Sequence, residues 1–375
     1  MGKKILLISY RLGYDSLLYW DKILSYIKAK HIDFTVYTAW KPCETKDRTV
    51  TTENRINGVK LYVSKNKLNQ KLIFLPLPGF LISVRKLTPD IIILNEFNLA
   101  SFYIVLYKRF IYRRARILLL VESAPNFKEV NDPSRTPLRT FYRQFIARSA
   151  NIVLTNNQIG YQYINKGLKV QDNRIKIRPY LTSNPPIGEK SITRDTSRIH
   201  LITVGRLIER KGHKYLIEAI SNLPAEVQDK ILLRIIGEGP LRQSLFELCE
   251  RRSVKCVNII GAVDYGEMYL YYHDSDCLIL PTLQDYRSLV GFEALSFGLA
   301  IITSKFDGSR FEVIKEGENG FIVDPFNTID FSEKLQLLIS NKTLLEKFKQ
   351  QSSAMAAEYS ERVCIENLLS TIDEL

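Results

Sequence analysis

The stretch VGRLIERKGH, residues 204–213, decides how this sequence is interpreted, because an apolar run ends here in a short basic loop. A strand is predicted to end at Gly205 and a helix to begin near Gly212. Arg206 and Lys211 stand between them. The amino terminus of a helix has free N–H groups and a partial positive charge, so the segment favours an anion. The two cations predict a clamp for a diphosphate, and a solvated basic loop is the alternative.

A second stretch, PTLQDYRSLVGFEAL at residues 281–295, has the same order of strand, loop and helix. Asp285 stands on the loop, and Glu293 lies about one turn into a helix that is otherwise apolar over Leu289–Leu299. Because burying an unpaired carboxylate is costly, Glu293 needs a partner. The hydroxyls of a ribose would supply one, and a salt bridge to a nearby arginine is the alternative.

Both halves of the chain alternate short apolar runs with amphipathic ones. This alternation predicts two α/β lobes, each a parallel sheet covered by helices, with ligands bound beyond the carboxyl ends of the strands. Strands are expected at residues 4–9, 34–38, 60–63, 91–94, 116–121, 152–155, 200–205, 232–237, 257–261, 277–281, 300–303 and 320–323. Helices are expected at residues 17–30, 138–150, 213–222, 241–252, 331–339, 344–358 and 361–375.

A polar stretch at residues 182–197, which contains two prolines and a glycine and has no apolar period, is expected to link the lobes. The N-terminal lobe is then residues 1–181, and the C-terminal lobe is residues 198–358. Residues 359–375 are expected to form a helix that packs back towards the N-terminal lobe. A length of 375 residues, with 45 % hydrophobic and 25 % charged residues, fits two domains with buried cores.

No segment of the sequence suggests a membrane span or a secretion signal. The apolar run after Met1 stops at Ser9, and the tract Leu72–Val84 is interrupted by prolines and falls short of about 18 residues. The five cysteines include no C-x-x-C pair, and the four histidines lack metal-ligand spacing. Asp274-Ser275-Asp276 is interpreted as a helix end, not as a metal site. These features predict a cytoplasmic protein with reduced thiols and no bound metal.

Five motifs over roughly residues 199–325 resemble, in order, those of the family 4 (group 1) glycosyltransferases. The acidic pair Asp285…Glu293 resembles their E-x7-E signature, and Gly205-Arg206-Leu207 with Lys211-Gly212 resembles their diphosphate clamp. Their G-x-G-P turn and the closing segments of the same lobe are similar to Gly237–Pro240, Asp307–Ile314 and Asn319–Val323.

The resemblance implies the GT-B fold, in which two Rossmann-like lobes face each other across a cleft. It also implies transfer from a UDP- or GDP-linked sugar with retention of configuration, with no cofactor and no required metal. By analogy, Arg206 and Lys211 would hold the diphosphate, Asp285 the sugar and Glu293 the ribose. By the same analogy the backbone N–H groups of Leu289 and Val290 would meet the phosphates, and the backbone at Gly13 would approach the donor phosphate. The nucleotide base would lie near Gly261.

The sequence departs from the family beside the donor sugar. The first glutamate of the signature is Asp285, one methylene shorter. The usual Gly-Phe-Gly that follows is Tyr286-Arg287-Ser288. Arg287 is expected to point to solvent, and recognition of an acidic or unusually substituted sugar is the alternative.

The N-terminal lobe is less faithful to the family. Its first loop keeps only Gly13 of a glycine pair. Glu122 follows a predicted strand where relatives often have a histidine near the reacting centre, so it is the candidate catalytic residue of this lobe. Glu96 occupies a similar strand-end position. Either would orient the acceptor hydroxyl, and an ordinary loop carboxylate is the alternative for both.

The basic excess of the chain, a net +13, lies in its N-terminal half. Residues 1–190 hold 32 Lys and Arg against 13 Asp and Glu, a net +19, while residues 191–375 hold 21 against 27, a net −6. Two stretches, Tyr107–Arg116 and Arg135–Arg148, combine arginines with aromatic residues. Helices of this kind favour attachment to anionic lipid, and a core-packing helix with a solvated basic face is the alternative. The arginines expected at the membrane surface are Arg109, Arg113, Arg114, Arg139 and Arg143.

Together these features predict a hexosyltransferase that uses a nucleotide sugar and a lipid-linked or saccharide acceptor at the cytoplasmic face of the cell membrane. The family suggests bacterial surface-polysaccharide or lipopolysaccharide assembly as the setting. One alternative is a nucleotide-sugar epimerase of the same fold, which would release free sugar without an acceptor.

A second alternative is a non-catalytic GT-B subunit that binds a partner transferase. The loss of one glycine of the pair in the first N-terminal loop favours this alternative. The presence of Arg206, Lys211 and Glu293 disfavours it. A nucleic-acid partner is not expected, because it would explain the charge but not the C-terminal motifs. A nicotinamide dehydrogenase is disfavoured, because no G-x-G-x-x-G follows the first strand.

Overall fold

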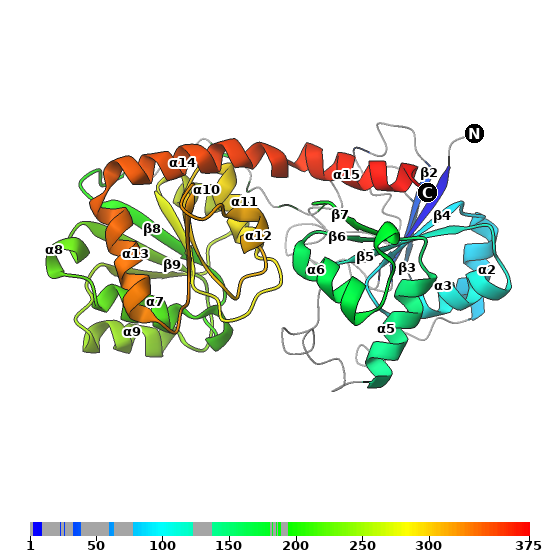
Figure 1. Ribbon diagram of the computed structural model, residues 1–375, viewed down its shortest axis with the longest axis horizontal. Helices are drawn as coiled ribbons and strands as arrows, with labels where there is room; N and C mark the ends of the chain where they lie inside the picture. Colours follow the sequence, from blue (N-terminus) through cyan, green and yellow to red (C-terminus); the bar gives the residue numbers. More distant parts are fainter. Residues whose placement is uncertain are drawn as a thin grey trace. The chain divides into compact units, whose positions relative to one another are not determined.

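The computed structural model describes residues 3–9, 23, 26, 33–38, 60–63, 78–122, 137–180, 182, 185, 187–188 and 194–375. The chain divides into two compact units. The N-terminal unit combines Met1–Leu181 with Cys364–Leu375, and the C-terminal unit is Thr182–Val363. Each unit contains a sheet flanked by helices (Figure 1), so the prediction of two lobes built on parallel sheets is confirmed.

The sheet of the N-terminal unit is parallel, and its described strands lie in the order β3-β2-β1-β4-β5-β6-β7. The chain reverses its direction of progress between β1 and β4, and such a switch point is where α/β sheets bind ligands. The strands are β1 (Lys4–Ser9), β2 (Asp33–Thr38), β3 (Lys60–Val63), β4 (Ile91–Asn95), β5 (Arg116–Val121), β6 (Ile152–Thr155) and β7 (Ile175–Ile177). The helices and helical turns are α2 (Pro78–Leu87), α3 (Leu99–Phe110), α5 (Pro137–Ser149), α6 (Gln158–Gln162), η2 (Tyr163–Gly167), η3 (Asp172–Arg174) and α15 (Glu361–Asp373).

Helices cover both faces of the N-terminal sheet, and this explains why β4 and β5 are nearly continuous runs of Ile and Leu. On one face the strands pack with α2, α3, α5 and η2 in a core that contains Ile92 and Ile146. On the other face Ile93 belongs to the same core as Ile365 of α15. Residues 364–375 therefore complete this unit, although the whole C-terminal unit precedes them in the sequence.

The sheet of the C-terminal unit is also parallel, in the order β10-β9-β8-β11-β12-β13, so it repeats the arrangement of the first six strands of the chain. The strands are β8 (Ile199–Val204), β9 (Ile231–Ile236), β10 (Val257–Gly261), β11 (Cys277–Leu280), β12 (Ala300–Ser304) and β13 (Gly320–Val323). The helices and turns are η4 (Glu209–Lys211), α7 (His213–Ser221), α8 (Ala225–Gln228), α9 (Arg242–Arg251), η5 (Tyr265–Glu267), α10 (Met268–His273), α11 (Leu289–Ser296), α12 (Arg310–Val313), α13 (Thr328–Ser340), α14 (Lys342–Ala356) and η6 (Ala357–Tyr359).

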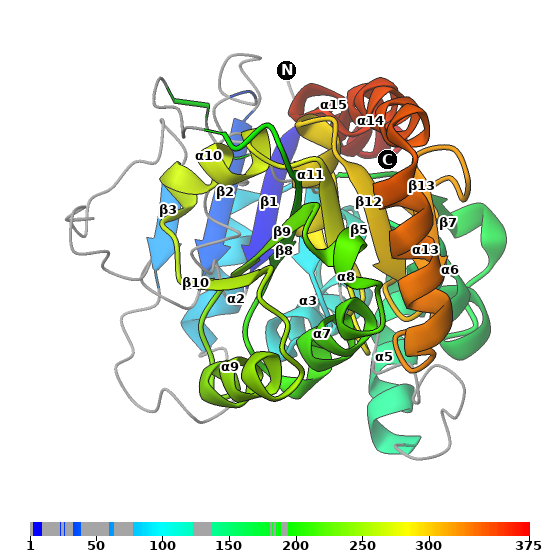
Figure 2. The same cartoon turned by 90° about the vertical axis from the view of Figure 1, so that its left-hand side faces the viewer.

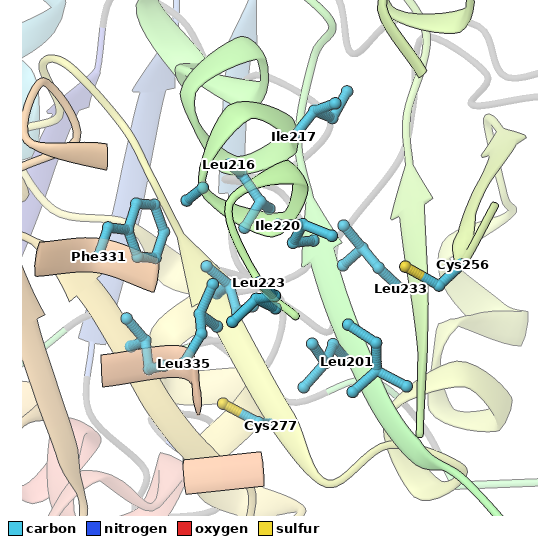
Figure 3. Packing of buried hydrophobic residues seen from close by; sticks show 14 of the residues in the cluster. Leu201, Leu216, Ile217, Ile220, Leu223, Leu233, Cys256, Cys277, Phe331 and Leu335 are labelled. Atoms are coloured by element: carbon cyan, nitrogen blue, oxygen red, sulfur yellow. The ribbon is translucent and has the colours of Figure 1, made fainter. Parts of the chain in front are cut away.

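Two apolar layers hold the C-terminal unit together. Leu216 of α7 and Phe331 of α13 lie in the layer on one face of the sheet (Figure 3). Phe292 of α11 and Met355 of α14 pack on the opposite face. Figure 2 shows α7, α8, α9 and α13 gathered on one side of the strands. The loops that carry the predicted motifs follow the carboxyl ends of β8 and β11, at the edge of the sheet between the two layers.

Three features differ from the sequence prediction. Strand β7 and the helices α2, α6, α8 and α12 were not expected, and α3 begins at Leu99, ahead of the basic stretch. The basic stretch Tyr107–Arg116 is not one helix, because α3 ends at Phe110 and β5 begins at Arg116. Residues 182–197, the expected linker, are part of the C-terminal unit. The expected helix at residues 17–30 lies outside the described residues, apart from Ile23 and Tyr26.

Candidate functional site

The loops that follow β8 and β11 pack directly on each other at the carboxyl edge of the C-terminal sheet. Gly212 has a φ of 69°, and a Cβ there would lie 2.0 Å from the carbonyl oxygen of Pro281. The N–H of Leu283 and the hydroxyl of Thr282 both donate to the carbonyl of Arg210, over 2.8 and 3.0 Å. A glycine at position 212 is what allows the basic loop and the acidic loop to meet.

This packing brings the candidate diphosphate cation to the candidate sugar carboxylate. Lys211 Nζ donates to Asp285 Oδ2 over 2.6 Å, and Arg210 Nη1 lies 3.4 Å from the same oxygen. The side chains of Lys211 and Asp285 are 17 % and 16 % exposed, so solvent screens the pair only in part. Arg206 on the same loop is exposed, and within the described part of the chain its side chain has no hydrogen-bonded or charged partner.

Gly261, the position predicted to lie near the nucleotide base, ends β10 at the same edge of the sheet. Its carbonyl accepts the N–H of Gly237 over 2.7 Å, and a Cβ at this position would lie 2.7 Å from Arg242 Nη1 and 2.8 Å from Glu238 Oε1, which form an ion pair. The N–H of Leu207 donates to the carbonyl of Glu238 over 2.9 Å. Backbone hydrogen bonds therefore connect the carboxyl ends of β8, β9 and β10.

Glu293 lies on α11 and is 6 % exposed. Its Oε2 accepts a hydrogen bond from the hydroxyl of Tyr272 on α10 over 2.5 Å. Burial, followed by the charge of Glu293, raises the pKa of Tyr272 well above its ordinary value, so the hydroxyl remains a donor. Leu289 and Val290 form the first turn of α11, whose N-cap residue Ser288 makes no side-chain capping hydrogen bond. The turn therefore presents backbone amides that an anion would satisfy.

Arg287 does not point to solvent, so that expectation is wrong. Its guanidinium forms a two-pronged pair with Glu312 of α12, with Nε 2.8 Å from Oε2 and Nη2 2.9 Å from Oε1. The two side chains are 3 % and 7 % exposed, and the guanidinium lies 4.0 Å from the centre of the Phe292 ring. Burial raises the pKa of Glu312, and Arg287 opposes that rise. The guanidinium is thus engaged inside the unit and ties the acidic loop to α12.

Asp307 is a buried carboxylate near Asp285 to which the sequence analysis assigned no role. The N–H of Gly308 donates to the carbonyl of Asp285 over 2.9 Å. The Asp307 side chain accepts the hydroxyls of Thr303 and Ser309, over 3.2 and 2.8 Å. Burial raises the pKa of Asp307, and the charge of Asp285 adds to the rise. The Asp-Gly-Ser segment is a signal in the sequence that could have drawn attention to Asp307. Its nearness to Asp285, however, follows from the pairing of β12 with β11.

Asp274 and Asp276 lie just before β11, at the opposite edge of the sheet. Asp274 is the C-cap residue of α10, as its interpretation as a helix end requires, and its Oδ2 lies 2.6 Å from Arg234 Nη2. Asp276 pairs with Arg194 and Lys349, over 2.6 and 3.1 Å. Among the described residues, no group of three His, Cys, Asp or Glu side chains is arranged to hold a metal ion.

Glu96 and Glu122 lie together at the carboxyl edge of the N-terminal sheet. Glu96 follows β4 with a φ of 65°, a conformation that costs roughly 1–3 kcal/mol in residues other than glycine. Its Oε1 accepts the backbone N–H of Glu122, which follows β5, over 2.6 Å. The Glu96 carboxylate is therefore hydrogen-bonded to the backbone of Glu122, the other candidate acceptor-site residue. Gly13 lies outside the described residues.

Four of the five arginines expected at a membrane are exposed, namely Arg109, Arg113, Arg114 and Arg139. At the end of α3, exposed apolar side chains lie among them: Phe110 is 70 % and Ile111 62 % exposed. At the start of α5, Leu138 and Phe141 are 85 % and 70 % exposed. These apolar side chains next to arginines form two patches, one at each of these helix ends.

Arg143 differs from the other four. It lies on α5 and is only half-exposed. Its Nη1 donates to the Tyr163 hydroxyl over 2.9 Å, and its guanidinium lies 5.3 Å from the centre of the Phe97 ring. Arg143 is therefore held by the N-terminal unit and does not project freely towards solvent.

The chain also has recognisable relatives in sequence, and several of the matches cover less than half of it. Residues 188–355 match the family described as "Glycosyl transferases group 1". An uncharacterized glycosyltransferase of Haemophilus influenzae is 28 % identical over 167 residues, which are 44 % of this chain and 46 % of that protein, so the chain spans about half the length of this relative. The Campylobacter jejuni N-acetylgalactosamine-N,N'-diacetylbacillosaminyl-diphospho-undecaprenol 4-alpha-N-acetylgalactosaminyltransferase is 21 % identical over 302 residues, 80 % of this chain and 81 % of that protein.

Solved structures match nearly the full length of the chain. The Anabaena protein Alr3699/HepE, in complex with UDP, gives a TM-score of 0.73 at 16 % identity and covers 99 % of this chain and 100 % of its own. The lipopolysaccharide outer core galactosyltransferase WaaB gives a TM-score of 0.73 at 14 % identity, with 99 % of each chain covered. The chain therefore has the GT-B fold, and its residues 188–355 match the group 1 glycosyltransferases.

Proposed function

We propose that this chain is a glycosyltransferase that moves a sugar, with retention of configuration, from a UDP- or GDP-linked donor to a lipid-linked or saccharide acceptor. The observation that carries the proposal is the meeting of Lys211 and Asp285 at the carboxyl edge of a sheet, within the residues that match the group 1 glycosyltransferases. Arg206 stands on the same loop as Lys211, and Glu293 stands on the helix that follows Asp285.

In this proposal the cations act on the leaving group. When the bond between sugar and diphosphate breaks, negative charge grows on the phosphate oxygens, and Arg206 and Lys211 stabilise that charge more than they stabilise the bound donor. Lys211 exchanges Asp285 for phosphate, which frees the carboxylate to accept hydrogen bonds from sugar hydroxyls. Glu293 accepts hydrogen bonds from the ribose, and the amides at the start of α11 donate to phosphate.

The proposed acceptor site is the carboxyl edge of the N-terminal sheet, where Glu122 orients the attacking hydroxyl and Glu96 holds the backbone of Glu122 in place. The name of the Campylobacter relative states an acceptor linked to diphospho-undecaprenol, and the match to it covers 80 % of this chain. Together with the fold shared with a lipopolysaccharide galactosyltransferase, this supports a role in bacterial surface-polysaccharide or lipopolysaccharide assembly.

We also infer that the N-terminal unit attaches to the anionic inner surface of the cell membrane. Exposed arginines next to exposed apolar side chains, such as Arg139 beside Leu138, are the pattern of interfacial attachment. No helix within the described ranges is long and apolar enough to cross a bilayer. The protein should sediment with vesicles that contain phosphatidylglycerol, less so as salt rises, and Leu138→Ser with Phe141→Ser should weaken that binding. Equal sedimentation with neutral vesicles would contradict the inference.

The function is tested first by donor binding. A thermal-shift panel of nucleoside diphosphates and UDP- and GDP-linked sugars should show selective stabilisation by one donor, because a ligand stabilises the fold it binds. Turnover with that donor should fall about 10²–10³-fold in Arg206→Ala and in Lys211→Ala, with little loss of thermal stability. Full turnover in the presence of EDTA is expected, since side-chain cations face the leaving group. Absence of any donor-dependent shift would contradict the proposal, and release of free sugar without an acceptor would point to an epimerase.

A further inference from the structure

Arg143 is an arginine fixed by aromatic side chains. It lies on α5 (Figure 1), and its Nη1 donates to the hydroxyl of Tyr163 over 2.9 Å. The guanidinium also lies 5.3 Å from the centre of the Phe97 ring and 5.9 Å from that of Tyr163. Contact with two rings restricts an arginine that would otherwise sample many rotamers.

Within the described ranges, most of the N–H donors of this guanidinium have no protein acceptor. An arginine has five N–H donors, and among the described residues the one acceptor that Arg143 reaches is the Tyr163 hydroxyl. No carboxylate of the described ranges forms an ion pair with it. The buried arginines of the C-terminal unit contrast with this arrangement, since Arg287 and Arg234 each pair with a carboxylate. A positioned cation that keeps free donors is suited to bind an anion from outside the chain.

The position of the guanidinium points to the acceptor. Phe97 comes two residues after the end of β4, so the ring and the guanidinium over it lie at the carboxyl edge of the N-terminal sheet. Glu96 and Glu122 lie at the same edge. This is the edge at which α/β sheets bind ligands, and it belongs to the unit that does not carry the donor motifs.

We propose that Arg143 binds a phosphate group of the acceptor, namely the phosphate or diphosphate through which an acceptor sugar is attached to its lipid carrier. The planar guanidinium fork matches two phosphate oxygens, and contact with the two aromatic rings restricts the rotamers that the side chain can adopt. This inference rests on the lipid-linked acceptor of the proposed function. It assigns Arg143 to substrate recognition and leaves Arg109, Arg113, Arg114 and Arg139 to the membrane surface.

The experiment measures the binding of farnesyl diphosphate by calorimetry. All proteins carry Lys211→Ala, so that the proposed donor diphosphate site contributes little. Arg143→Met should weaken binding about tenfold or more, because a charge-assisted contact is lost, and Arg143→Lys should lie between Met and the parent. Tyr163→Phe, which removes only the hydroxyl that orients the guanidinium, should give a smaller loss. The matched control is Arg148→Met, which makes the same charge change at an exposed position of α5.

Further controls distinguish this site from the donor site and from the membrane surface. Farnesol, which has no phosphate, should bind equally to Arg143→Met and the parent. When Lys211 is intact, Arg143→Met should keep the donor-dependent thermal shift. Absence of that shift in the parent and in all the variants would count against the proposed function and not against this site. Vesicle sedimentation should be the same for Arg143→Met and Arg148→Met.

Three results would overturn the inference. The first is equal binding of farnesyl diphosphate by Arg143→Met and the parent, and the second is no binding by the parent at all. The third is a loss of vesicle binding that is specific to Arg143→Met while diphosphate binding is unchanged, because the phosphate recognised would then belong to a membrane headgroup.

Discussion

Lys211 Nζ lies 2.6 Å from Asp285 Oδ2, so a cation assigned to the donor diphosphate is neutralised by a carboxylate assigned to the donor sugar. The two side chains therefore remain paired until a ligand replaces one of them as the partner of the other. In the proposed function, a nucleoside diphosphate would offer a new partner to Lys211 alone. A sugar nucleotide would offer partners to both residues, so we expect the exchange to favour the complete donor.

Asp285→Asn should separate these two ligands. The change removes the charge that competes for Lys211, so the affinity for nucleoside diphosphate should be unchanged or rise a few-fold. Affinity for the sugar nucleotide and turnover should fall, because the amide no longer accepts from the sugar hydroxyls with a full charge. Calorimetric titration with both ligands checks this. Equal weakening of the two would contradict the role of Asp285 at the sugar.

Glu293→Gln should weaken nucleoside diphosphate and sugar nucleotide alike, each by about tenfold, since both contain the ribose that the carboxylate is proposed to hold. Tyr272→Phe removes the hydroxyl that donates to Glu293 and keeps the charge, so its effect on both ligands should be smaller. Parallel titrations of the two variants are the measurement. A Glu293→Gln protein that binds both ligands as the parent does would argue for a purely structural carboxylate.

Arg287→Met should destabilise the chain strongly, because it leaves the Glu312 carboxylate buried without its partner. The expected loss in unfolding free energy is about 3–5 kcal/mol. Arg287→Phe combined with Glu312→Leu removes both charges and should lie much closer to the parent. Urea unfolding of the single and double variants measures the difference. An Arg287→Met protein as stable as the parent would show that the pair contributes no stability.

His213 predicts a loss of stability in acid. Burial is the main cause that lowers the pKa of His213 from 6.5 to about 4, with the charge of Lys211 adding to it. As pH falls from about 6.5 towards 4, the unfolded chain gains a proton on this imidazole and the folded chain does not, so stability present above 6.5 is lost through that window.

The size of this loss should be on the order of 1–3 kcal/mol. His213→Leu should flatten the dependence of the urea midpoint on pH between 4 and 6.5. His273→Leu, at an exposed histidine of the same unit, should leave the slope as in the parent. Identical slopes in the parent and His213→Leu would mean that other groups set the acid sensitivity.

The architecture could be predicted because the strands of a covered parallel sheet are short apolar runs. Ile91–Asn95 and Cys277–Leu280 are such runs, and each is fully buried. Strand β7 could not be predicted in this way because it has three residues and only the first is buried. The prediction of one basic helix over Tyr107–Arg116 was wrong. The basic residues follow one another in sequence, but they are divided between the end of α3, a turn and the start of β5.

The loops and helices of the candidate site could be predicted, but their pairings could not. Lys211 and Asp285 are 74 residues apart, and Arg287 and Glu312 are 25 apart. Both contacts depend on which strands lie next to each other in the sheet. An arginine in a polar loop is usually solvated, so only the fold reveals that Arg287 has a buried carboxylate within reach.

Helix α15 also has a consequence for the order in which the chain folds during synthesis. The C-terminal unit is continuous, so a ribosome releases everything it needs once residue 363 has emerged. The N-terminal unit is begun first, but Ile365 and Leu368, which fill one side of its core, emerge only after the other unit is complete. Domains made first commonly fold first. Here one apolar face of the first sheet is fully covered only when a helix encoded nearly two hundred residues later emerges, which gives chaperones a long interval in which to bind it.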